Sequence, residues 1–187
     1  MKTDQIQVPL GIGSACRALA LCAVRVVVLL LTRRIHLPVE NRARRLSFAD
    51  RTTADVFRET RIDRAAATDP CVLVVKFRLR AVRGRGHALF RWESVLNTVL
   101  FAGFPGLISK LWLAHDRNGV YRGLYEWDGP AAAESYARAL WRVLAVVSVP
   151  GSIGYHIQPG LRRADLFDSV DAGRSDATEW WRLTGIS

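Results

Sequence analysis

Residues 102–127, AGFPGLISKLWLAHDRNGVYRGLYEW, hold the strongest fold signal in the sequence. Two runs of strand-forming residues, 107–115 and 120–127, flank the tetrapeptide at 116–119. The Asn-Gly pair in this tetrapeptide is typical of a tight turn, because both residues tolerate a positive φ. The stretch therefore predicts a β-hairpin.

The segments on either side of the hairpin complete a recognisable order. Residues 71–79 alternate as a strand does, and residues 88–101 carry apolar side chains at helical spacing. A second helix over 130–147 and a short strand over 152–158 follow the hairpin. The order βαββαβ predicts an α+β fold, a ferredoxin-like sandwich with one antiparallel sheet and two helices on one face. A second copy of the chain commonly covers the other face, so we expect a homodimer through the sheet face.

A two-residue Asn-Gly turn would place Trp112 opposite Tyr125 and Lys110 opposite Trp127. By the two-residue period of strands, one face of the hairpin then holds Ile108, Lys110, Trp112, Ala114, Tyr121, Gly123, Tyr125 and Trp127. The other face holds Leu107, Ser109, Leu111, Leu113, His115, Val120, Arg122, Leu124 and Glu126. The aromatic face either packs as sheet core or dimer interface, or lines an apolar ligand pocket.

An apolar segment at residues 10–32 precedes this domain and contains Arg17 and Arg25. Its length suits a bilayer span, but a central arginine costs about 2.5–3.5 kcal/mol on insertion. Three alternatives remain: a helix lying on or anchored in the membrane, a helix packed on the protein or on a partner subunit, and a single span. We expect a cytoplasmic location, with attachment to the cytoplasmic face of the membrane as one of the alternatives.

The remaining boundaries follow from composition. Residues 1–38 form the N-terminal apolar segment and 39–70 a basic connector with an extra strand near 52–62. Residues 71–160 form the α+β domain. Residues 161–187 form a polar tail whose Trp180-Trp181 pair docks on the domain or on a partner.

Composition excludes several classes of function. The net charge is +10, but the arginines are scattered, and no RNP-like run of basic and aromatic residues supports nucleic-acid binding. The three cysteines, without a CxxC pair, argue against a disulfide framework and a zinc site. No histidine pair has metal-ligand spacing, so no metal is expected.

The motif F-P-G-x-x-x-K-x-W at 104–112, R-G-L-Y-E-W at 122–127 and an Ala-rich helix with Tyr136 resemble the YdhR-like mono-oxygenase family of the dimeric α+β barrel superfamily. The resemblance covers residues 72–158. It implies a homodimeric barrel and a cavity between sheet and helices. The implied activity is cofactor-independent oxygenation of an apolar aromatic or polyketide-like substrate, although relatives in the superfamily bind haem through a histidine.

The candidate catalytic residues are assigned from this chemistry. Trp112 and Tyr125 could stack on a substrate ring, and Lys110 could stabilise an enolate or phenolate. Asn97 could hydrogen-bond a substrate oxygen, and His115 could act as base or haem ligand. The first hypothesis is an oxygenase or related small-molecule enzyme without a cofactor. The alternative is a non-catalytic protein of the same fold that binds a small ligand, including haem, or assembles at a membrane.

Overall fold

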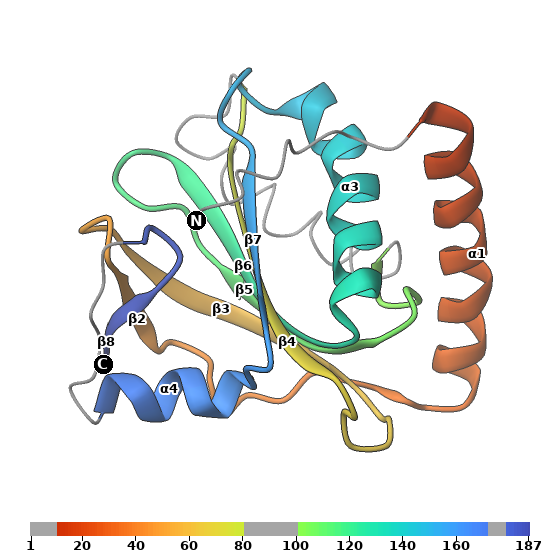
Figure 1. Cartoon of the computed structure of the whole chain (residues 1–187), viewed down its shortest axis with the longest axis horizontal. Coiled ribbons are helices and arrows are strands. Elements are labelled where there is room, and N and C mark those ends of the chain that lie inside the picture. The colour runs from red at the N-terminus through yellow and green to blue at the C-terminus, as the bar shows by residue number, and fades with distance from the viewer. Residues whose placement is uncertain (1–10, 81–100, 172–178) are drawn as a thin grey trace.

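The computed structural model describes residues 11–80, 101–171 and 179–187, and its centre is an antiparallel sheet with helices packed on it (Figure 1). Within these residues, eight strands form the sheet in the order β7-β4-β6-β5-β3-β2-β8, with β1 paired to β3. The strands are β1 (Ile35–His36), β2 (Arg45–Phe48), β3 (Thr53–Ile62), β4 (Pro70–Arg78), β5 (Leu107–Leu113), β6 (Val120–Asp128), β7 (Gly154–Pro159) and β8 (Leu183–Ile186). The helices are α1 (Ile12–Leu31), α3 (Pro130–Val147) and α4 (Arg163–Asp171).

The strand order β7-β4-β6-β5 is that of a ferredoxin-like sandwich, with the predicted hairpin formed by β5 and β6. The predicted α+β fold class is therefore confirmed. The extra strand expected near 52–62 is β3, which pairs antiparallel with β5 and extends the sheet beyond the hairpin. The helix expected at 88–101 falls, except for its last residue, outside the described residues.

The turn of the hairpin is longer than the predicted two-residue turn. The Gly119 N–H donates to the Asp116 carbonyl at 2.9 Å. The Asp116 carboxylate accepts the backbone N–H groups of Asn118 at 2.8 Å and Val120 at 3.0 Å. Gly119 has a φ of 75°, as expected for a bulge residue that follows a turn. The Asp116 carboxylate thus stabilises a wider loop.

The wider loop shifts the hairpin register by two residues from the prediction. Lys110 pairs with Tyr125, and Trp112 pairs with Gly123. The predicted pairs of Trp112 with Tyr125 and of Lys110 with Trp127 are therefore wrong. A shift of two residues leaves each side chain on its own face. The predicted faces consequently hold along most of the hairpin.

The two ends of β5 depart from the predicted faces. A β-bulge between Leu107 and Ser109 brings Leu107 opposite Trp127, so Leu107 joins the aromatic face. At the other end, His115 lies two residues beyond the end of β5, and its ring centroid lies 5.4 Å from that of Tyr121. Both departures come from local breaks in the two-residue period.

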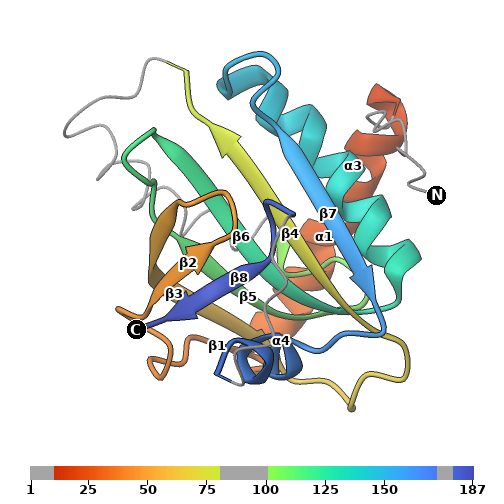
Figure 2. The same cartoon turned by 60° about the vertical axis from the view of Figure 1, so that its left-hand side comes forward.

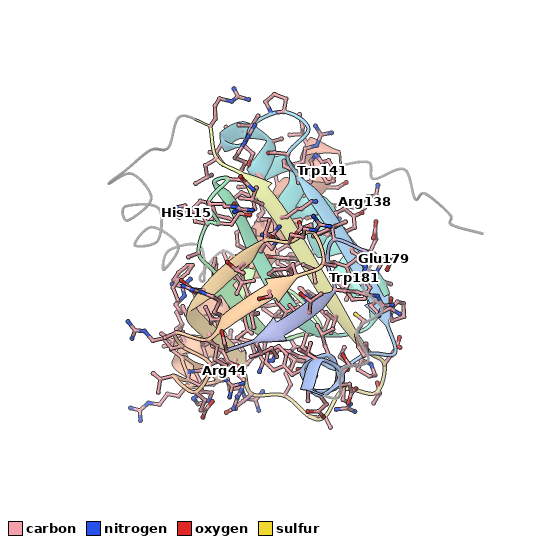
Figure 3. All side chains as sticks on the ribbon, turned by 90° about the vertical axis from the view of Figure 1, so that its left-hand side faces the viewer. Arg44, His115, Arg138, Trp141, Glu179 and Trp181 are labelled. Carbon is pink, nitrogen blue, oxygen red and sulfur yellow. The ribbon has the colours of Figure 1, made fainter. Side chains whose placement is uncertain are left out.

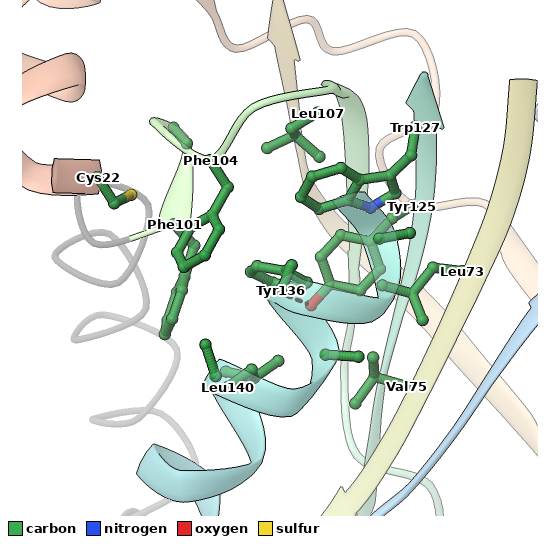
Figure 4. Close-up of a cluster of buried hydrophobic side chains, with 14 of the residues drawn as sticks. Cys22, Leu73, Val75, Phe101, Phe104, Leu107, Tyr125, Trp127, Tyr136 and Leu140 are labelled. Atoms are coloured by element: carbon green, nitrogen blue, oxygen red, sulfur yellow. Dashed lines mark hydrogen bonds between the residues drawn. The ribbon is translucent and has the colours of Figure 1, made fainter. Parts of the chain in front are cut away.

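The aromatic face of the sheet packs against α3, α1 and the segment that leads into β5 (Figure 4). Buried side chains of this layer are Cys22, Val26, Leu73, Val75, Phe101, Phe104, Leu107, Tyr125, Trp127, Tyr136 and Leu140. The face that carries Lys110, Trp112 and Tyr125 therefore looks into the interior of its own chain. This arrangement agrees with sheet core or a pocket and not with a dimer interface.

The opposite face of the sheet is covered by β2, β8 and α4, on the side away from α1 and α3 (Figure 2). Leu111, Leu113 and Leu124 are fully buried there. Trp181 packs in this layer, and its ring stacks on that of His156 at 4.3 Å. The tail expected to be polar thus folds as α4 and β8. Because the chain covers this face itself, the premise for dimerisation through it does not hold, and a homodimer stays a prediction that would need another surface.

Helix α1 matches the apolar segment expected at 10–32. Ala15, Cys22 and Val26 are its buried residues, and it lies alongside α3 (Figure 1). Most of the other apolar side chains on α1 are exposed. One face of the segment therefore packs on the protein, as one of the three alternatives proposed.

Candidate functional site

Lys110 lies in the middle of β5, between β6 and β3, and its side chain is buried. Its Nζ lies 3.0 Å from the ring centroid of Trp112 and 4.7 Å from that of Tyr125. The Phe101 ring centroid is 5.9 Å away. A cation over aromatic faces is attracted by the ring quadrupoles. The alternation of β5 thus places the amino group of Lys110 among three aromatic rings.

Trp112 is held in place from the neighbouring strand β3. Its Nε1 donates a hydrogen bond to Thr60 Oγ1 at 3.1 Å, and both side chains are buried. The guanidinium carbon of Arg58 lies 4.2 Å from the Trp112 ring centroid. Two basic side chains, Lys110 and Arg58, therefore contact one indole ring.

A pair of tyrosines forms another part of the site. The Tyr136 hydroxyl, on α3, donates a hydrogen bond to the Tyr125 hydroxyl at 3.1 Å (Figure 4). Burial raises the pKa of both tyrosines, so both remain protonated phenols. A Cβ at Gly123 would lie 2.6 Å from the Tyr125 ring. Gly123 therefore leaves the space that the Tyr125 ring occupies.

Burial lowers the pKa of Lys110 well below its usual value, and the positive charge of Arg58 lowers it further. Among the residues that the structure describes, no carboxylate forms an ion pair with Lys110. Desolvation of this kind favours the neutral amine, which is a proton acceptor. Burial at this position therefore disfavours the ammonium form of Lys110.

The space beside Lys110 is small. A cavity of about 10 Å³ is lined by Thr60, Phe101, Ala102, Leu107, Lys110, Trp112, Tyr125 and Tyr136. This volume admits about one water molecule, so a ring system enters only if aromatic side chains move. A larger open depression of about 620 Å³ lies at the C-terminal end of α1, lined by Leu29, Arg34, Asp63, Arg64, Ala65 and Asp128. Its two arginines and two aspartates balance in charge, and it lies apart from Lys110.

The structure brings together three of the five residues predicted from sequence: Lys110, Trp112 and Tyr125. His115 lies at the turn end of the hairpin (Figure 3). Its ring lies beside that of Tyr121, and it is not among the residues that line this cavity. Asn97 lies outside the described residues.

Three further residues belong to the site: Arg58 and Thr60 on β3, and Tyr136 on α3. Tyr136 could be placed on the inward face of its helix from sequence, but nothing pointed to its hydrogen bond. Arg58 and Thr60 were not predicted, because apolar and polar residues alternate only weakly along β3. In the described part of the chain, no group of three His, Cys, Asp or Glu residues is placed to hold a metal ion.

The strand order and the two-layer packing define the class of this protein as ferredoxin-like α+β. No family model matches the chain, and no curated protein matches it.

Several solved structures resemble the chain. One is an uncharacterised ferredoxin-fold protein from Listeria monocytogenes described as related to antibiotic biosynthesis monooxygenases, at 13% identity over 59% of this chain and 66% of that chain, with a TM-score of 0.44. A monooxygenase-like protein from Listeria innocua is also 13% identical, over 60% of this chain and 65% of that one, with a TM-score of 0.43. An anthrone oxidase-like protein is 12% identical over 60% of this chain and 58% of that one, with a TM-score of 0.36.

The chain thus spans just under two thirds of the length of the first two structures. Likenesses this distant assign no activity, and the narrower resemblance to the YdhR-like family stays a prediction.

Proposed function

We propose that the chain is a cofactor-independent mono-oxygenase, or a related small-molecule enzyme, that acts on an apolar aromatic or polyketide-like substrate. The observation that carries the proposal is the burial of Lys110 among Phe101, Trp112 and Tyr125 with a lowered pKa. A general base works best when its pKa lies near the working pH. Burial of Lys110 among aromatic rings shifts its pKa downward, toward this condition.

The chemistry needs a substrate that can become electron-rich. In the first step, the neutral amine of Lys110 accepts a proton from an acidic methylene group that is conjugated with a ketone through aromatic rings. The ammonium ion then formed stabilises the enolate, while the Trp112 and Tyr125 rings contact the substrate ring. The enolate reduces molecular oxygen directly. One oxygen atom becomes the new carbonyl oxygen, and the other leaves as water with the two hydrogens of the methylene group.

Oxygen uptake tests this proposal. We expect the purified chain to oxidise anthrone, a tricyclic ketone with an acidic methylene group, faster than the uncatalysed reaction. Lys110→Met keeps the length and apolar stem of the side chain, and we expect it to lower kcat by about 10²-fold or more, as loss of a general base does. Lys76→Met is the matched control, because Lys76 is a half-buried sheet lysine whose Nζ lies 4.1 Å from the Trp180 ring centroid. Equal turnover by both variants would contradict the role of Lys110.

The small size of the cavity favours a second candidate, a non-catalytic binding or assembly protein of the same fold. Under this alternative, oxygen uptake stays at the uncatalysed rate. Quenching of tryptophan fluorescence by anthrone would then distinguish ligand binding from no binding. Haem binding belongs to this candidate, and a haem titration followed by Soret absorbance tests it directly.

A further inference from the structure

Helix α1 is built into the core by its inner face (Figure 4). Cys22 and Val26 are fully buried and belong to the same core cluster as Phe101 and Phe104. A Cβ on Gly103 would lie 2.1 Å from the Cys22 carbonyl oxygen, so the helix backbone lies directly against that glycine. A helix that left the domain to cross a bilayer would uncover this part of the core. The inner face therefore argues against a separate span.

The outer face of α1 is apolar and exposed. Its apolar side chains are between 51% and 80% exposed, and they are Leu21, Val24, Val27, Val28, Leu30 and Leu31. Four of these recur at steps of three and four residues and form one stripe along the helix. Leu37 and Val39, just beyond the helix, are also exposed. Contiguous exposed apolar surface of this kind marks a site of interaction.

The positive charge around this apolar stripe favours a negatively charged partner. Residues 11–39 contain no aspartate or glutamate, whereas Arg17, Arg25, Arg33 and Arg34 are all exposed. A second copy of the chain would oppose these charges with the same positive charges, which is unfavourable. An anionic lipid surface instead offers a negative partner to each arginine.

We propose that α1 lies in the plane of an anionic membrane surface, with its outer face in the boundary between headgroups and acyl chains and its inner face still packed on the sheet domain. With its 20 residues, α1 is long and apolar enough for a span by length and composition. Arg17 and Arg25 oppose a span, but in the plane their long side chains reach the headgroup phosphates. In this arrangement the inner face of α1 stays packed on the domain and the outer face is removed from water. The proposal does not depend on the proposed catalysis.

Co-sedimentation of the full chain with vesicles tests the proposal. We expect binding to vesicles of equal parts phosphatidylglycerol and phosphatidylcholine, and much weaker binding to phosphatidylcholine alone. Val24→Ser/Val28→Ser should weaken binding about thirtyfold, because two half-exposed valines lose their apolar contribution. Serine and valine have similar helix propensities, so the helix is kept. Val146→Ser/Val147→Ser, two exposed valines on α3, is the matched control and should leave binding unchanged.

The charge is tested separately with Arg17→Gln/Arg25→Gln. We expect about a thirtyfold loss on the anionic vesicles and no change on phosphatidylcholine. Circular dichroism melting of each variant should match the parent protein, since the altered side chains are exposed. The proposal is overturned if the parent protein binds neither vesicle, or if the Val24→Ser/Val28→Ser variant binds as well as the parent. A vesicle-free dimer that this variant converts to a monomer would overturn it in favour of a second copy. Binding that resists both high salt and alkaline extraction would overturn it in favour of a span.

Discussion

Replacing Gly103 by alanine should loosen α1 from the domain. The new methyl group would lie 2.1 Å from the Cys22 carbonyl oxygen and 3.0 Å from Val26 Cγ2. Overpacking of a core costs about 1–3 kcal/mol, and the upper end applies here because the obstacle is helix backbone and not a flexible side chain. For a chain of this size each kcal/mol lowers Tm by about 2–4 °C, so we expect a loss of about 6–12 °C.

Urea unfolding followed by tryptophan fluorescence measures this cost. Gly154→Ala is the control, because its Cβ would meet only the Lys76 side chain at 3.5 Å, an ordinary contact. We expect the control to stay within about 0.5 kcal/mol of the parent protein. A second measurement follows the helix, since a displaced α1 should make the buried Cys22 thiol more accessible to reagents. If both alanine variants unfold alike and Cys22 stays protected, the inferred contact between α1 and Gly103 is refuted.

Three further changes follow from the same geometry. Burial lowers the pKa of Lys110 below its value in the unfolded chain, so the unfolded chain binds more protons than the folded protein at pH values between the two. Over this pH range the free energy of unfolding should rise with pH, by up to about 1.4 kcal/mol per pH unit. In urea titrations, Lys110→Met should flatten this rise. If the free energy of unfolding of the parent protein did not rise with pH over this range, the inferred cost of burying a charged Lys110 would be contradicted. Trp181→Ala should cost about 3–5 kcal/mol, because the side chain is 2% exposed and fills the outer layer, and unchanged thermal melting would show that the tail does not stabilise the sheet. Exposed Cys16 should react with a disulfide reagent in the folded protein, whereas burial raises the pKa of Cys22 to about 11 and of Cys71 to about 12, so both should react only on unfolding; equal rates for all three thiols would be inconsistent with the structure.

The hairpin shows how much of the structure can be predicted from the sequence alone. Strand-forming runs and the Asn-Gly pair located both strands, and the two-residue period assigned most faces correctly. The register was wrong by two residues, because the Asp116 side chain caps its own turn and widens it. Turn length depends on such a side-chain hydrogen bond, which residue periodicity does not contain.

The larger error of prediction concerns the layer of β2, β8 and α4 that covers the sheet face opposite α1 and α3. The tail at 161–187 is polar on average, so α4 and β8 were not predicted, and a second copy was expected to cover the sheet. Leu166 and Val170 do recur at helical spacing, but this signal is short and surrounded by charges. At the site, the sequence identified Lys110, Trp112 and Tyr125. It could not supply Arg58 and Thr60, because their approach depends on the pairing of β3 with β5, which joins distant segments.

The pairing of β2 with β8 has a consequence for how the chain is made. These two strands are far apart in the sequence, since Leu46 pairs with Ile186, and Arg45 exchanges two backbone hydrogen bonds with Ser187. Contacts so far apart along the chain are slow to form, because a long loop must close first. During synthesis, β2 can pair with β8 only after residues 183–187 have left the ribosome, and until then part of the outer face of the sheet stays uncovered. We expect nascent chains to depend on chaperones in this interval, even though the folded protein buries the leucines and valines of that face.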